Sequence, residues 1–60
     1  MSRKDYVALA RAIADAYKID PGSKPILNYV TRSLADVLQS DNPRFNRQRF
    51  YDACGSDLTA

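Results

Sequence analysis

The fold of this chain is decided by residues 41–55, which read DNPRFNRQRFYDACG. Asn46 is one of the residue types that cap the start of a helix, and Gly55 suits the left-handed backbone found just past a helix end. Phe45 and Phe50 stand at the two positions of a hydrophobic staple, which fixes the direction in which the chain enters a helix. The segment therefore predicts a complete short helix with its own start and stop.

That helix is expected over about residues 47–54. It is too short to be stable alone in water, so it must pack against the rest of the chain. Two longer helices are predicted before it, over about residues 3–18 and about 24–39. The predicted fold class is all-α: a small three-helix domain with two longer antiparallel helices and a short third one. Residues 1–60 are expected to form a single helical domain.

Apolar residues recur at spacings of three and four in both longer helices, as on an amphipathic helix. The stripe of the first helix is Tyr6, Leu9, Ala10, Ile13, Ala14 and Tyr17, and that of the second is Ile26, Leu27, Val30, Leu34, Val37 and Leu38. Residues 20–23 are turn formers, and Ser23 is placed to cap the second helix, which has Pro25 in its first turn. Residues 56–60 are predicted to be a tail that frays unless Leu58 docks.

The size of the chain limits how it can be stabilised. Sixty residues bury only about 60% of the surface that the unfolded chain exposes, so the core is marginal. Small domains often add disulfides, a metal or self-association. A single cysteine, Cys54, excludes an internal disulfide, and the lack of histidine excludes the usual zinc sites. We therefore expect no metal and no cofactor, and we expect either a homo-oligomer or an accessory protein bound to a larger partner.

The charge balance is only mildly basic. Nine Lys and Arg residues against seven Asp give a net charge of +2, which is too little for a general nucleic-acid binder. Three of the nine positive charges fall within residues 44–49, so their distribution matters more than their sum. The sequence contains neither the apolar run of a signal peptide nor a stretch of membrane-spanning length. We therefore expect a cytoplasmic protein without membrane contact.

Arg44, Arg47 and Arg49 are the first candidate partner-binding residues. Cations near the start of a helix oppose its dipole, at about 0.3–1 kcal/mol each when exposed, so stability alone would favour acids there. Guanidinium groups kept at that place point to a partner's phosphates or carboxylates. The alternative is an ordinary solvated face, in which Arg49 reaches Asp52 and Arg44 lies near Asp41.

Gln48 and two tyrosines complete the candidate set. Gln48 between two arginines resembles a DNA recognition helix, but the connection before it is long and contains proline, which weakens that interpretation. Tyr29 and Tyr51 lie off the apolar stripes, and tyrosine is frequent at the centres of interfaces, although ordinary surface is an equal alternative. The predicted partner-binding residues are Arg44, Arg47, Gln48, Arg49, Tyr51 and Tyr29.

The sequence gives no indication of catalysis, so we expect that the protein is not an enzyme. Cys54 lies in the last turn of a helix, where the dipole disfavours a thiolate, and the chain has no histidine to act as a base. No pair of aspartates has the spacing of two-carboxylate catalysis. Gly22 and Gly55 stand alone, so there is no glycine-rich phosphate loop.

Residues 41–50, continued by Ala53-Cys54-Gly55, resemble the C-terminal signature of short uncharacterised bacteriophage and prophage proteins. Those proteins open with a Lys-Asp-Tyr stretch, as Lys4-Asp5-Tyr6 does here, and many have Asp where this chain has Asn46. Either residue caps a helix. The resemblance implies a phage or prophage origin, and hence the cytoplasm of a bacterial host. It supplies no functional residues.

Two functions follow as hypotheses. The first is a binding module that regulates or inhibits another protein, host or viral, through the arginine and aromatic residues of its last helix. The second is a nucleic-acid-binding protein that uses the same arginines together with Arg3 and Lys4. A structural role within a virion is a third, weaker alternative.

Overall fold

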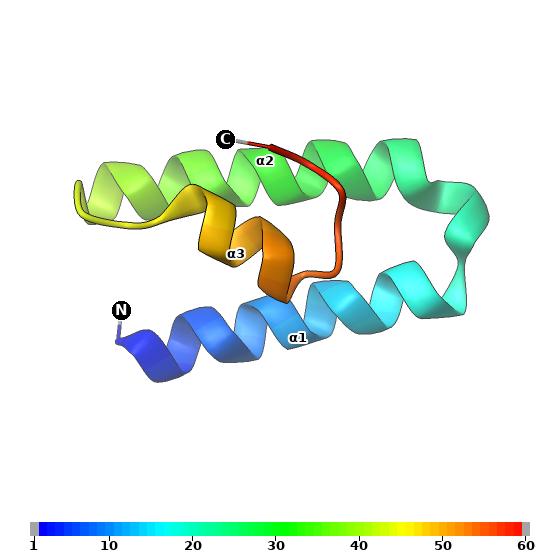
Figure 1. Ribbon diagram of the computed structural model, residues 1–60, viewed down its shortest axis with the longest axis horizontal. Helices are drawn as coiled ribbons and strands as arrows, with labels where there is room; N and C mark the ends of the chain where they lie inside the picture. The colour runs from blue at the N-terminus through cyan, green and yellow to red at the C-terminus, as the bar shows by residue number, and fades with distance from the viewer. Residues whose placement is uncertain (1, 60) are drawn as a thin grey trace.

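The computed structural model describes residues 2–59, in which all regular structure is helical. The elements are α1 (Arg3–Ile19), a 3₁₀ turn η1 (Pro21–Ser23), α2 (Lys24–Asp41) and α3 (Arg47–Ala53). α1 and α2 run antiparallel, and α3 lies between them (Figure 1). The predicted all-α, three-helix fold is confirmed, and each helix boundary lies within two residues of its predicted place.

α1 begins and packs as its sequence predicts. The backbone N–H of Ser2 donates a hydrogen bond to the Asp5 carboxylate over 2.9 Å, which satisfies a group that has no partner inside the helix. One side of the helix contributes Ala10 and Ile13 to the core. Residues of the same predicted stripe pack around them, namely Tyr6, Leu9 and Tyr17.

The turn between α1 and α2 differs from the prediction in one detail. The Ser23 hydroxyl donates to the Asp20 carboxylate over 2.7 Å and makes no capping hydrogen bond to α2. Because η1 leads directly into α2, the start of α2 is set by the 3₁₀ turn and by Pro25 in its first turn.

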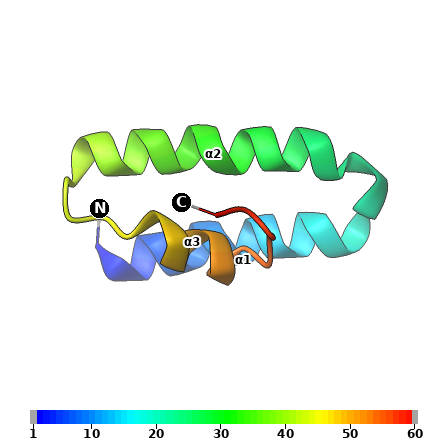
Figure 2. The same ribbon diagram turned by 45° about the horizontal axis from the view of Figure 1, so that its top comes forward.

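α2 buries only part of the apolar stripe predicted for it. Its buried residues are Thr31, Ala35 and Leu38, and Leu34 packs beside them. Three other stripe residues are exposed: Ile26, Val30 and Val37. The reason is that α1, α3 and the tail all lie on one side of α2 (Figure 2), and these three residues are on the side of the helix turned away from them.

α3 is fixed by the devices that its sequence contains. The Asn46 side chain accepts a hydrogen bond from the Arg49 backbone N–H over 3.1 Å, and Gly55 has a φ of 71°. The Phe45 and Phe50 rings form the predicted staple, with centroids 5.5 Å apart. Aromatic residues of this segment fill the space between α1 and α2, and Cys54 is fully buried there.

Residues 56–59 run from the end of α3 towards α2 (Figure 1). Leu58 is 7% exposed and belongs to the core cluster, so the described part of the tail is docked. Lys24 donates to the Asp57 carboxylate over 2.9 Å, and this hydrogen bond holds the pKa of Asp57 below its usual value. Ala60, the last residue of the predicted tail, lies outside the described residues.

Candidate partner-binding groove

α3 has two sides with opposite characters. One side faces α2 and is closed by hydrogen bonds and an ion pair. The other side faces the first half of α1 and leaves an open groove. Both sides carry arginines from the predicted set, so the structure separates residues that look equivalent in the sequence.

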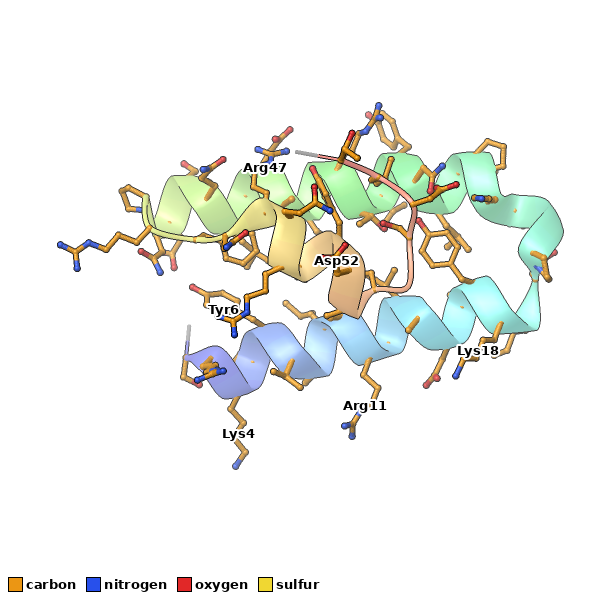
Figure 3. The ribbon with its side chains drawn as sticks, viewed as in Figure 1. Lys4, Tyr6, Arg11, Lys18, Arg47 and Asp52 are labelled. Carbon is orange, nitrogen blue, oxygen red and sulfur yellow. The ribbon has the colours of Figure 1, made fainter. Side chains whose placement is uncertain are left out.

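Arg47 belongs to the closed side. Its guanidinium group forms a 2.6 Å ion pair with Asp36 and donates to the Gln39 side chain over 3.0 Å. It also donates to the Tyr51 hydroxyl over 3.0 Å and 3.3 Å. The bond to Tyr51, followed by that to Asp36, raises the pKa of Arg47 above its ordinary value. Figure 3 shows Arg47 directed from α3 towards α2.

Two further predicted residues are also used inside the molecule. Tyr51 is only 2% exposed, so in this conformation its ring packs in the core and its hydroxyl accepts from Arg47. The Gln48 side chain donates to Asp52 over 3.0 Å and to the Leu58 carbonyl over 3.2 Å. These contacts join α3 to α2 and to the tail, and they give Arg47, Gln48 and Tyr51 a structural role.

The open side of α3 forms a groove of about 400 Å³ with the N-terminal half of α1. Its apolar lining comes from both helices and from the loop before α3: Tyr6, Val7, Ala10, Phe45, Phe50 and Ala53. The polar residues that line it are Arg3, Asn42, Arg44, Asn46 and Arg49. The groove therefore combines an apolar surface with three guanidinium groups.

Within the described residues, the three arginines of the groove have no acidic partner. Within residues 2–59, Arg3, Arg44 and Arg49 form no ion pair, and all three are exposed. The alternative in which Arg49 reaches Asp52 is therefore not the arrangement found. Unpaired guanidinium groups beside apolar surface suit a ligand that carries both carboxylates or phosphates and an apolar group.

Tyr6 supplies an unusual part of the groove lining. Its ring packs edge-on against Phe45, with centroids 5.1 Å apart. Its hydroxyl oxygen is buried and has no hydrogen-bond partner among residues 2–59. A buried hydroxyl without a partner costs about 1–3 kcal/mol, so this side of the molecule is less completely satisfied than the side facing α2.

Other cations lie away from the groove. Figure 3 shows Lys4 and Arg11 pointing from α1 in the direction opposite to α3, and Lys18 at the far end of that helix. Tyr29, the remaining predicted site residue, is 74% exposed on α2 and does not line the groove. The structure thus brings together Arg44 and Arg49 from the predicted set, and adds Arg3, Tyr6 and Val7, which were not predicted as groove residues.

The described residues also include acidic side chains and one cysteine, Cys54. No group of three or more His, Cys, Asp or Glu side chains there is arranged to hold a metal ion. Burial raises the pKa of the Cys54 thiol to about 11, so the thiol stays protonated near neutral pH. Over the same residues, no helix has the length and apolar character needed to cross a membrane.

Comparison of the chain with protein-family models, with curated proteins and with solved structures gave no match in any of the three searches.

Proposed function

We propose that this chain is a small helical binding module that regulates or inhibits another protein, and that it does so through the groove between α1 and α3. The observation that carries the proposal is the apolar groove whose arginines, Arg44, Arg49 and Arg3, have no acidic partner in residues 2–59. A protein surface that presents an apolar side chain flanked by Asp or Glu has the matching chemistry. A phage or prophage origin is proposed from the resemblance of residues 41–55 and of Lys4-Asp5-Tyr6.

The arrangement favours a protein ligand over nucleic acid. A duplex or a single strand is normally bound by a row of cations that follows the phosphate backbone. Here Lys4 and Arg11 point away from the groove, and the guanidinium groups border an apolar surface (Figure 3). The partner-binding residues of this proposal are Arg44 and Arg49, with Arg3, Tyr6 and Val7 completing the surface.

The test compares two double variants with the same change in charge. Arg44→Ala/Arg49→Ala removes two positive charges from the groove, and Lys4→Ala/Arg11→Ala removes two from the far side of α1. Each tagged protein is used to capture partners from a bacterial host lysate, which are quantified by mass spectrometry. Charge-assisted hydrogen bonds contribute about 1.5–3 kcal/mol each, so loss of both arginines should weaken partner binding by at least about a hundredfold. The control variant should bind like the unaltered chain.

Equal capture by both variants would exclude the groove as the binding surface. The nucleic-acid alternative is tested with the same variants and with labelled duplex and single-stranded DNA. For that alternative, the logarithm of the affinity should fall with the logarithm of salt concentration with a slope near −0.9 per phosphate on a duplex. DNA binding with that slope, lost in the groove variant, would replace the protein-binding proposal.

A further inference from the structure

The outer side of α2 carries an apolar face that the fold leaves uncovered. Four large apolar residues on it are well exposed: Ile26 at 68%, Tyr29 at 74%, Val30 at 40% and Val37 at 64%. Their spacing places them on one side of the helix, with Ser33 among them. Figure 2 shows α1, α3 and the tail all on one side of α2, and the buried residues of α2 are on the opposite side of the helix from this row: Thr31, Ala35 and Leu38.

We infer that this face of α2 binds the same face of a second copy of the chain, with the two α2 helices antiparallel. We define the α2 outer face as Ile26, Tyr29, Val30, Ser33 and Val37. The inference is independent of the groove, because none of these residues lines it.

The α2 outer face can pair with a second copy of itself. A two-fold axis beside Ser33 places Val30 of one copy opposite Val37 of the other, and the reverse contact follows by symmetry. Ser33 itself then lies next to its own counterpart. Because serine is small, two helices can approach closely at that point, while the larger side chains pack on either side of it. The same axis places Ile26 level with Asp41 of the second copy, at the end of the apolar row.

One border of the α2 outer face carries one positive and one negative side chain. Arg32 is exposed and makes no ion pair within residues 2–59, while Asp36 stays 67% exposed although it pairs with Arg47. In the antiparallel arrangement, Arg32 of each copy lies alongside Asp36 of the other. The two-fold axis that gives this contact lies within one residue, along α2, of the axis that pairs Val30 with Val37. One cation and one anion on the border match a second copy better than they match a strongly acidic or basic partner.

The α2 outer face is small. The face extends over residues 26–37, about 17 Å at 1.5 Å per residue, so the contact is smaller than a standard interface of about 800 Å² per partner. We therefore expect a weak, reversible dimer. Such a dimer adds apolar burial to a chain whose core is limited by its 60 residues.

The experiment is sedimentation equilibrium of the full chain from about 10 μM to about 1 mM, the range in which a small interface dissociates. The unaltered chain should change from monomer to dimer over this range. Val37→Lys should raise the dissociation constant by about tenfold or more, because it places an ammonium group in the apolar row. Ile19→Lys is the matched control, since Ile19 is 84% exposed on α1, and it should not change association. Circular dichroism checks that both variants keep their helices.

Orientation is tested by oxidative crosslinking of two single variants. Ser33→Cys should give a disulfide-linked dimer quickly, because the two copies of residue 33 meet at the axis, whereas Ser40→Cys should crosslink slowly. The native Cys54 is fully buried and serves as the background in both. A chain that stays monomeric at the highest concentration would overturn the inference, and so would association unaffected by Val37→Lys. Equal crosslinking at residues 33 and 40 would overturn the antiparallel arrangement.

Discussion

The two sides of α3 differ in how completely their polar groups are satisfied. On the side facing α2, Arg47 bonds to Asp36, Gln39 and Tyr51. On the side facing α1, Arg49 has no acidic partner in residues 2–59 and lines a groove whose Tyr6 hydroxyl is buried without a hydrogen bond. Arginines two positions apart thus have different surroundings: Arg47 attaches α3 to α2, and Arg49 lines the groove proposed to bind a partner.

The largest expected effect is the loss of α3 docking altogether. Phe50 is 4% exposed and belongs to the core cluster, so Phe50→Ala should lower the free energy of unfolding by about 3–5 kcal/mol. That is a large part of the total stability of a small domain. Urea unfolding followed by circular dichroism measures the change. Tyr29→Ala, at an exposed position and low protein concentration, should change it by no more than about 0.5 kcal/mol. Equal stability of the two variants would mean that α3 does not dock as described.

A second prediction separates the two arginines directly. Arg47→Met removes the ion pair to Asp36 and leaves the Tyr51 hydroxyl without its donor, so it should lower the melting temperature by several degrees. Arg49→Met makes the same chemical change at a residue that has no acidic partner in residues 2–59 and whose cation opposes the helix dipole. The melting temperature should therefore stay level or rise slightly. Thermal unfolding at low ionic strength measures both variants. Similar decreases for the two would refute the distinction between the sides.

Local signals were sufficient to predict α3. Asn46, Gly55 and the pair Phe45 and Phe50 act within a few residues of the helix, and each has its predicted role in the structure. The all-α class and the two longer helices also followed from periodicity. A chain of this size has few ways to bury two amphipathic helices and a short third one, so the arrangement was predictable as well.

The distinction between the arginines was not predictable from the sequence. Arg47 is closed off by Asp36 and Gln39 of α2, and such contacts depend on how α3 is placed between the long helices. The same placement decides that Tyr51 is buried, although it lies off the expected apolar line. It also leaves Val37 exposed on α2. These features depend on tertiary packing, about which helical periodicity carries no information.

A third prediction uses Cys54, which lies where the end of α3 meets the core. Desolvation raises the pKa of its thiol to about 11 in the folded chain, above the unfolded value near 9. The Cys54 thiol therefore loses its proton at a lower pH in the unfolded state than in the folded state. Its contribution to stability is complete below about pH 9 and is lost as the pH rises towards 11. For each protein, the free energy of unfolding is compared with its own value at pH 7. On raising the pH, this free energy should begin to fall at a lower pH in the unaltered chain than in Cys54→Ala. Identical pH profiles would show that the thiol is not desolvated by docking of α3.

The smallest predicted effect tests the open side of α3 and has the opposite sign. The Tyr6 hydroxyl is buried beside Phe45 with no hydrogen-bond partner in residues 2–59, so the folded state gains nothing from it and loses its hydration. Tyr6→Phe keeps the edge-on ring contact and removes the desolvated oxygen, so it should raise the free energy of unfolding by up to about 1 kcal/mol. Tyr17→Phe is the matched control: the Tyr17 hydroxyl donates to Asn28 over 2.6 Å, and its loss should destabilise the chain. Urea unfolding of the two variants side by side gives the comparison. If Tyr6→Phe is destabilising like Tyr17→Phe, the Tyr6 hydroxyl has a partner in solution, such as a bound water, and the two sides of α3 are equally well satisfied.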